Sequence, residues 1–379
     1  MRRYLIILFV VFFSFINSSC GRGPGKDEYW NIPDNFVMGD YEIQDEVNLT
    51  CFAHDDNKYY NLWQELVYDN DGVFNYFNSY KFLNTNNRIQ INVPKGLDVE
   101  IALLNDKKEV VYSNIPNANG ICYLFPNWSS YSYNVLVKYF DSITSEEIVN
   151  EYEVRGSLNL DVDAITVKKE IIDLMFVVDT TASMGDELDY LKNEINDVIN
   201  RVSNNNHCMV NVAILLYKDK GEIYETLYSD FTSKIDEQVE FLNNKIAFGG
   251  GDYEEAVEVA IEEASLKSWS GSNGTKILVH IGDAPAHDEN VEKWYNAVLD
   301  LCDKGVRIIT VASSGITKKT EYLFRSMTLI SNGTYVALTN DSNIGDEHMD
   351  PSVDLDVEIE YLDNCLVRLI SLYHTGRNY

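Results

Sequence analysis

Three oxygen-bearing side chains stand at alternate positions directly after an apolar run, and their types and spacing suit a hard metal ion. The run from Ile171 to Val178 is typical of a buried strand, and Asp179, Thr181 and Ser183 follow it. A tight loop after a strand can turn three such side chains toward one point, and Gly185 favours the exit into a helix. Carboxylate and hydroxyl oxygens suit Mg²⁺, Mn²⁺ or Ca²⁺. We therefore expect a divalent cation to bind where this strand ends.

Helix capping is the other interpretation of these residues, since Asp, Ser and Thr accept hydrogen bonds from free N–H groups at helix N-termini. Two further motifs favour the metal site. Residues 249–256 read Gly-Gly-Gly-Asp-Tyr-Glu-Glu-Ala, and an apolar run over 277–281 leads to Asp283 in the sequence Asp-Ala-Pro-Ala-His. Capping explains neither the glycine-rich loop with Asp252 nor Asp283.

In this order, the three motifs resemble the metal-ion-dependent adhesion site of the von Willebrand factor A (VWA) family. The Gly-Gly-Gly-Asp loop and the Asp-Ala-Pro-x-His run are similar to those of a bacterial and hemicentin-like branch, which includes lipoproteins, and the resemblance covers residues 168–373. It implies a protein ligand and a bound divalent cation, Mg²⁺ in the first place and Mn²⁺ or Ca²⁺ as alternatives. Hydroxyl groups would bind the ion, and carboxylates would act directly or through water. The implied ligands are Asp179, Thr181, Ser183, Asp252 and Asp283.

The glycine-rich loop differs from the pattern best known in integrin domains, where a Thr supplies an oxygen and a partner's carboxylate takes the sixth position. Asp252 stands in the place of that Thr. If Asp252 binds directly, three carboxylates surround the dication and the site becomes formally negative. The metal is then held firmly, but an incoming Glu or Asp is attracted less strongly.

The second half of the chain alternates apolar, strand-like runs with amphipathic, helix-like stretches. Continuous apolar strands between amphipathic helices indicate a mostly parallel sheet covered on both faces, a Rossmann-like, doubly wound α/β fold. Ligands of such folds bind at the carboxyl ends of the strands. Strands are predicted over 171–178, 210–216, 277–281, 306–311 and 334–338, and helices over 186–203, 253–266, 291–304, 319–331 and 357–373.

The first half of the chain has a different sequence pattern, with short runs in which apolar and polar residues alternate. Such runs between Asn, Gly, Pro and Asp are typical of half-buried strands joined by turns. They predict a β-sandwich-like all-β domain over 29–165, loosely similar to Ig-like or prealbumin-like accessory modules. Its residues carry no ligand-like spacing, so we expect a spacer or a second contact surface. The VWA domain is expected over 168–379.

The first residues are typical of an export signal. Met1 and two arginines precede an apolar run over 4–16 that is short for a bilayer span, and small residues lead to Cys20. This resembles a bacterial lipobox, although Asn17 stands where an aliphatic residue is common. Ordinary secretion is the alternative. The lipobox interpretation predicts a signal peptide over 1–19, lipidation of Cys20 with a tether over 20–28, and an anchor on a bacterial membrane, at its periplasmic face or the cell surface.

Composition and single residues lead to further expectations. A length of 379 residues favours two domains, and 60 acidic against 30 basic residues, a net charge of -30, exclude nucleic acid as a partner. Cys51 and Cys122 could form a disulfide, or all the remaining cysteines could be free and buried. His280 is expected in the core. His287 could be a ligand or a base, but a surface position after a turn is expected.

The expected function is that of a membrane-anchored, cation-dependent protein-binding module of the bacterial cell envelope, without catalysis. A metal-dependent hydrolase or phosphotransferase that uses Asp179 is one alternative. Phosphotransferases of the haloacid dehalogenase type need a second Asp two residues later, however, and Thr181 stands there. The other alternative is a metal-stabilised scaffold whose partner docks on the β-rich domain.

Overall fold

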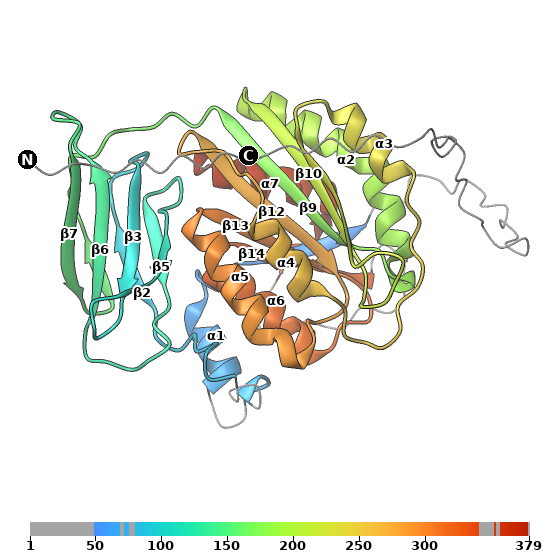
Figure 1. Ribbon diagram of the computed structural model, residues 1–379, viewed down its shortest axis with the longest axis horizontal. Helices are drawn as coiled ribbons and strands as arrows, with labels where there is room; N and C mark the ends of the chain where they lie inside the picture. Colours follow the sequence, from blue (N-terminus) through green and yellow to red (C-terminus); the bar gives the residue numbers. More distant parts are fainter. Residues whose placement is uncertain (1–48, 69–71, 76–79, 341–351, 354–356, 378–379) are drawn as a thin grey trace, which may run out of the picture. The chain divides into compact units, whose positions relative to one another are not determined.

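A mixed sheet of eight strands is the centre of the α/β part of the protein (Figure 1). The computed structural model describes residues 49–68, 72–75, 80–340, 352–353 and 357–377. The strand order is β11-β10-β9-β12-β13-β14-β1-β15, and the five strands from β10 to β14 in this order run parallel. The strands are β1 (Thr50–His54), β9 (Ile171–Asp179), β10 (Met209–Tyr217), β11 (Thr226–Thr232), β12 (Gly274–Gly282), β13 (Val306–Ala312), β14 (Thr334–Leu338) and β15 (Glu360–Tyr361).

Helices cover both faces of this sheet because the side chains of its central strands alternate between two apolar cores. In β9, Met175 and Val177 belong to the core that contains residues of α4, α5 and α6, whereas Leu174 and Phe176 belong to the core with α2, α3 and α7. The predicted doubly wound α/β fold is therefore confirmed. The helices are α2 (Gly185–Asn206), α3 (Ile235–Asn243), α4 (Val257–Ser265), α5 (Val291–Asp303), α6 (Lys318–Ile330) and α7 (Leu362–Thr375).

The segment before β9 contains two small sheets, with strand orders β5-β2-β8 and β4-β3-β6-β7. Their buried side chains, such as Ile91 and Leu124 of the first and Ile101 and Val137 of the second, belong to one apolar core. All pairs are antiparallel except β2 with β8. This confirms the β-rich region. Its elements are α1 (Tyr60–Tyr68), β2 (Ile89–Asn92), β3 (Val99–Leu104), β4 (Val110–Asn114), β5 (Ile121–Leu124), β6 (Tyr133–Phe140), β7 (Glu147–Val154) and β8 (Ser157–Asn159).

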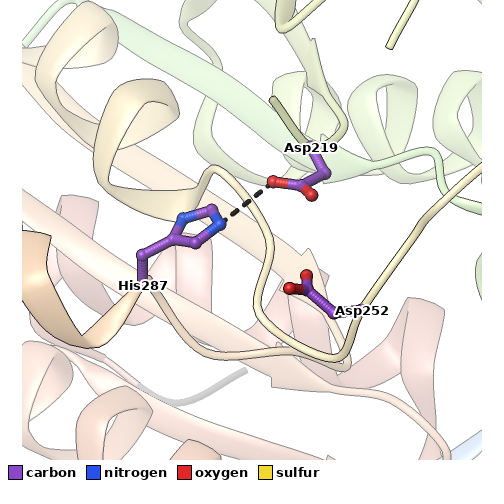
Figure 2. Close-up of side chains that lie close together, drawn as sticks. All are labelled: Asp219, Asp252 and His287. Carbon is purple, nitrogen blue, oxygen red and sulfur yellow. Dashed lines mark ion pairs between the residues drawn. The ribbon is translucent and has the colours of Figure 1, made fainter. Parts of the chain in front are cut away.

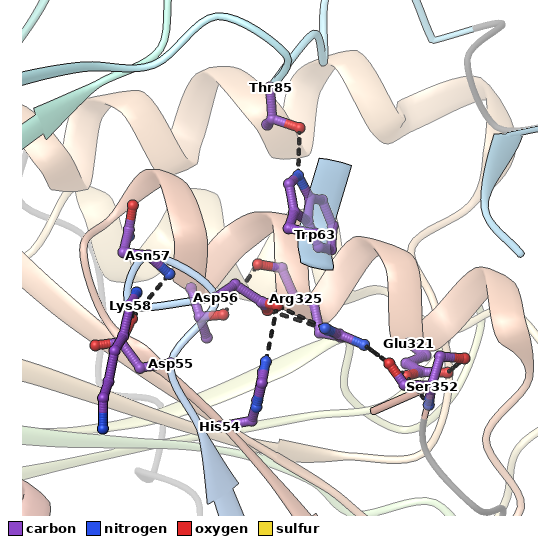
Figure 3. A network of polar contacts seen from close by, with 11 residues as sticks. His54, Asp55, Asp56, Asn57, Lys58, Trp63, Thr85, Glu321, Arg325 and Ser352 are labelled. Carbon is purple, nitrogen blue, oxygen red and sulfur yellow. Dashed lines mark hydrogen bonds and ion pairs between the residues drawn. The ribbon is translucent and has the colours of Figure 1, made fainter. Parts of the chain in front are cut away.

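One strand crosses the domain boundary that we expected. β1 belongs to the segment assigned to the β-rich domain, but it pairs antiparallel with β14 in the large sheet. The loop after β1 is fastened to α6 by a buried ion pair, in which Arg325 Nε donates to Asp56 Oδ2 at 3.0 Å (Figure 3). Arg325 also donates to Glu321, and His54 Nε2 lies 3.3 Å from Asp56 Oδ1. The described residues accordingly belong to one compact unit.

A second buried cation joins the β-rich region to the α/β part. Arg307 of β13 donates to Asn114 Oδ1 of β4 at 3.0 Å and to the carbonyl oxygen of Ser331 at 3.0 Å. Nearby, Asn332 Oδ1 accepts a hydrogen bond from the Tyr123 N–H at 2.8 Å. Buried charged groups need such partners, because an unpaired one costs several kcal/mol, on the order of 3–5. The two parts are therefore held by specific polar contacts.

The expected disulfide is absent among the described cysteines. Cys51 and Cys122 are both free and buried, in β1 of the large sheet and in β5 of a small one. The thiol beside Cys51 is that of Cys365 in α7. Of the two possibilities left open by the sequence, the disulfide is contradicted because β1 joins a different sheet from the rest of its segment, and free, buried cysteines are confirmed for this pair.

The predicted signal peptide, the tether and Cys20 lie outside the described residues, which begin at residue 49. Within the described residues, no helix has both the length and the apolar character that a membrane span requires.

Candidate metal centre

The Asp179 group comprises Asp179, Thr181, Ser183 and Asp283, at the carboxyl ends of the adjacent strands β9 and β12. The backbone N–H and the hydroxyl of Thr181 both donate to Asp179 Oδ1 at 2.8 Å. The hydroxyls of Thr181 and Ser183 lie 3.3 Å apart, and the Ser183 side chain hydrogen-bonds to Asp283. The structure thus brings together four of the five residues that the resemblance implied. Helix capping is not what these side chains do, because the described helix that follows has no side-chain cap.

Burial makes this group electrostatically costly without a counter-ion. Asp179 is fully buried, and within the described residues its Oδ2 has no hydrogen-bond partner. Burial, together with the nearby charge of Asp283, raises the pKa of Asp179 to about 7. Burial also raises the pKa of Asp283. Ser183 by contrast is exposed. A free buried carboxylate oxygen and two hydroxyls beside it match the donor set that a hard dication takes, so the residues fit such an ion.

The Asp252 group is a second cluster, formed by Asp252 with Asp219 and His287 (Figure 2). One ligand atom from each residue lies within 4.8 Å of the others. Asp219 follows β10, Asp252 is exposed on the glycine-rich loop, and His287 ends the Asp-Ala-Pro-Ala-His run. We expected Asp252 to belong with Asp179, but the structure places it beside Asp219 and His287.

His287 is buried, with 8% of its surface exposed, so the prediction of a surface position was wrong. The reason is Glu258 of α4, a fully buried carboxylate that lies 3.0 Å from His287 Nδ1. A buried carboxylate is stabilised by hydrogen bonds from donors such as this imidazole. The sequence gives no signal of this pairing, because Glu258 lies on the inward face of a helix in a different motif.

His280 is a core residue, as the alternation along its strand predicted. It is fully buried in β12, and its Nε2 lies 2.9 Å from the hydroxyl of Tyr217. Burial lowers the pKa of His280 to about 3, so the imidazole is neutral. His280 therefore supports the strands beneath the Asp179 group and supplies no charge to it.

Comparison with known families decides the nature of the α/β part. Residues 173–343 match the family model of the von Willebrand factor A domain. This part of the chain is a VWA domain. The resemblance implied the metal-ion-dependent adhesion site of this family at the residues of the Asp179 group.

Two curated relatives share part of the sequence. The putative ariadne-like RING finger protein R811 of Acanthamoeba polyphaga mimivirus is 32% identical over 120 residues, which cover 32% of this chain and 12% of that protein. The alpha-protein kinase vwkA of Dictyostelium discoideum is 24% identical over 200 residues, which cover 52% of this chain and 32% of that protein. The chain thus spans less than a third of the length of either relative.

Solved structures with similar segments include bacterial proteins. BatB from Bacteroides thetaiotaomicron has 14% sequence identity and a TM-score of 0.35, over 45% of this chain and 93% of that one. The pilus adhesin SpaC from Lactobacillus rhamnosus GG, in its open conformation, has 12% identity and a TM-score of 0.35, over 66% of this chain and 33% of that one.

Glu255 is a residue of the VWA domain that the sequence reasoning passed over. It is buried, with 4% of its surface exposed, and within the described residues its Oε2 has no hydrogen-bond partner. Burial and the charge of Asp179 raise the pKa of Glu255 to about 9, and Asp219, Asp283 and Asp252 act in the same direction. Its carboxylate therefore lies near both groups. A sequence signal for Glu255 was available, because this carboxylate stands three residues after Asp252 in the same motif.

Lys218 supplies a positive charge beneath these carboxylates. It is buried directly after β10, and its ammonium group donates to the carbonyl oxygens of Thr180 and Phe248. These bonds tie the loop after β9 to the start of the glycine-rich loop. The charge of Lys218 lowers the pKa of Asp179, but burial outweighs it.

Replacement of Gly250 by alanine is expected to weaken cation binding to the VWA domain. Gly250 has φ +90, a conformation that costs other residues about 1–2 kcal/mol. A Cβ there would lie in ordinary contact with Thr181 Cβ at 3.4 Å, but only 3.3 Å from Glu255 Oε1, so the Glu255 side chain would have to shift. Gly251→Ala is the matched control, because open space surrounds that position. Mg²⁺ should raise the melting temperature less in Gly250→Ala than in Gly251→Ala; equal increases would contradict the close approach.

Proposed function

We propose that the protein is a non-catalytic module that binds a protein partner through its VWA domain, and that this binding depends on a divalent cation at the Asp179 group. The observation that carries the proposal is the convergence of Asp179, Thr181, Ser183 and Asp283. A buried carboxylate oxygen without a partner supplies one donor, and exposed Ser183 keeps the group open to solvent. A cation held there would supply a Lewis-acidic position for an oxygen atom of the partner.

Mg²⁺ is the ion that we propose, because all four side chains offer hard oxygen donors. Asp179 and Asp283 together balance the charge of a dication. Asp252, which would have been a third carboxylate, lies beside Asp219 and His287 instead. An acidic side chain on the partner would then meet less negative charge than the sequence alone led us to expect.

The absence of catalysis is part of the proposal. A phosphotransferase mechanism of the haloacid dehalogenase type at Asp179 needs a general acid two residues later. The hydroxyl of Thr181 stands there, and it donates to Asp179 Oδ1. A hydroxyl of ordinary acidity is a weak proton donor, since general acids work best with a pKa near the operating pH. Phosphoester turnover that disappears in Asp179→Asn would contradict this part.

Metal-dependent capture tests the proposed function. The full chain, immobilised, should retain partner protein from a cell-envelope extract in Mg²⁺, and a chelator should release it. Asp179→Asn should retain none, whereas Asp106→Asn should behave like the wild type. Asp106 provides the same chemical change at an exposed turn of the β-rich region. Capture that is equal in chelator and in Mg²⁺ would contradict the proposal and favour a partner that docks on the β-rich region.

The location is proposed from the first residues of the sequence. Export and lipidation of Cys20, as in bacterial lipoproteins, would present the VWA domain on a membrane of the cell envelope. Metabolic labelling with a radioactive fatty acid tests this. The label should enter the wild type and not Cys20→Ser. An unlabelled wild type would contradict lipidation and favour ordinary secretion.

A further inference from the structure

The Asp252 group combines one imidazole with two carboxylates from three separate loops of the VWA domain (Figure 2). Asp219 comes from the loop after β10, Asp252 from the glycine-rich loop and His287 from the loop after β12. Their ligand atoms lie within 4.8 Å of one another. We infer that these three side chains form a second cation site, separate from the Asp179 group, which takes a divalent transition metal such as Zn²⁺.

Glu258 sets the orientation of the imidazole. Its carboxylate oxygens lie 3.0 and 3.3 Å from His287 Nδ1, and Asn290 Nδ2 donates to the same carboxylate at 2.8 Å. A carboxylate accepts hydrogen bonds and does not donate them, so Nδ1 carries the proton. Nε2 is thereby directed toward Asp219 with its lone pair available. A carboxylate behind the distal nitrogen is the common support of metal-binding histidines.

The pairing of His287 with Asp219 then places two acceptors face to face. His287 Nε2 lies 3.1 Å from Asp219 Oδ1, and within the described part of the chain that oxygen has no hydrogen-bond partner. A metal ion between them removes the conflict. Zinc binds nitrogen and oxygen ligands at about 2.0–2.2 Å, so two ligands at a right or tetrahedral angle stand about 2.8–3.6 Å apart. The observed separation falls within this range.

Glu255 is a buried acid close to both groups. Its carboxylate feels the charges of Asp179, Asp219, Asp283 and Asp252, and Oε2 has no partner among the described residues. Lys220 lies outside the group, 3.8 Å from Glu258. A buried oxygen without a partner is destabilising, and a cation at the Asp252 group would stabilise it.

The donor set selects the class of metal. An imidazole nitrogen with two carboxylates suits Zn²⁺ and its neighbours in the first transition row, whereas Mg²⁺ and Ca²⁺ prefer oxygen alone. Asp252 is exposed, so the site opens to solvent and can take a further ligand. The two groups therefore differ in the ion they bind, with Mg²⁺ at the Asp179 group and Zn²⁺ at the Asp252 group.

Calorimetric titration of the chelator-treated full chain with ZnCl₂ tests the second site in an Asp179→Asn background, where the Asp179 group is inactive. One Zn²⁺ should bind per chain. Adding Asp252→Asn or His287→Gln should reduce the affinity at least tenfold, and Glu258→Gln about tenfold, the loss common for an orienting carboxylate. His207→Asn, a change at an exposed histidine, should leave the affinity unchanged.

Two results would overturn the inference. One is the absence of Zn²⁺ binding in the Asp179→Asn background, which would mean that a protonated His287 pairs with Asp219 and Glu258. The other is Zn²⁺ binding that survives Asp252→Asn. Asp252→Asn keeps the test valid even if His287→Gln fails to fold, because Asp252 is exposed. Neither result bears on the proposed function, whose Mg²⁺ response is measured in the His287→Gln and Asp252→Asn single variants.

Discussion

Replacement of Arg325 by methionine is expected to lower the free energy of unfolding by about 3–5 kcal/mol. The side chains of Arg325 and Asp56 are both only 1% exposed, and Arg325 also donates to buried Glu321 (Figure 3). Without the guanidinium group, buried Asp56 loses its arginine partner, whereas buried Glu321 retains its ion pair with Lys318 at 3.0 Å. Because Asp56 follows β1 and Arg325 lies in α6, the loss also loosens the edge of the large sheet. Urea unfolding followed by circular dichroism measures the change.

Lys58→Met is the matched control for this prediction, because it removes an exposed cation from the same loop. Its effect should be within about 0.5 kcal/mol. The double variant Arg325→Met with Asp56→Asn should be less destabilised than the sum of its single variants, since the second change removes the unpaired charge. An Arg325→Met variant as stable as Lys58→Met would show that the buried ion pair is not formed.

Replacement of Asp179 by asparagine should stabilise the chelated protein at pH 8, although it removes a proposed metal ligand. Burial and Asp283 raise the pKa of Asp179 from its ordinary value of 3.8 to about 7. The folded state therefore holds this proton more tightly than the unfolded state, and the stability that the group contributes is lost as the pH rises through about 7. Asparagine cannot ionise, and it keeps the acceptor that Thr181 uses. We expect a gain on the order of 2 kcal/mol at pH 8.

Magnesium should reverse the order of stability of the wild type and Asp179→Asn. Mg²⁺ should raise the melting temperature of the wild type, more at pH 8 than at pH 5, because binding requires the ionised carboxylate. The melting temperature of Asp179→Asn should not respond, and that of Asp106→Asn should respond like the wild type. Thermal melts at both pH values, with and without chelator, measure all these differences. If chelated Asp179→Asn is less stable than the chelated wild type at pH 8, this would contradict the claim that the buried charge of Asp179 is destabilising.

The local chemistry of the Asp179 group could be predicted from the sequence because its members follow apolar strands directly. Asp179 and Asp283 end up side by side since β9 and β12 are parallel neighbours, and periodicity reveals such strands. Thr181 and Ser183 lie within the same loop, so their spacing alone places them near Asp179. The pairing of Asp179 with Asp283, however, joins distant parts of the chain and was implied by the resemblance, because periodicity does not show which strands are neighbours.

The glycine-rich loop could not be predicted in the same way. Gly249 and Gly250 both have positive φ, and these angles decide which carboxylate turns inward. The loop leaves Asp252 exposed beside Asp219 and buries Glu255, whereas spacing had favoured Asp252 as a ligand of the Asp179 group. A motif identifies the residues, but the backbone conformation between them determines where each side chain points.

Contacts between distant segments of the chain account for the other wrong predictions. β1 joins β14, almost three hundred residues later, and its alternation alone fits either half of the chain. Cys51 therefore came to lie in the large sheet rather than near Cys122. His287 follows a proline-containing turn, which favours the surface, but Glu258 in α4 provides a buried partner. Each of these contacts joins segments that no local pattern relates.

A crystal structure of the full chain in saturating Mn²⁺, with anomalous data at the manganese edge, tests the central claim most directly. Mn²⁺ stands in for Mg²⁺ because it takes similar oxygen ligands and scatters anomalously. The account predicts an anomalous peak about 2.0–2.3 Å from the hydroxyl oxygens of Thr181 and Ser183, and its loss in Asp179→Asn. Saturating Mn²⁺ without a peak at these hydroxyls, or a peak that persists in Asp179→Asn, would contradict it.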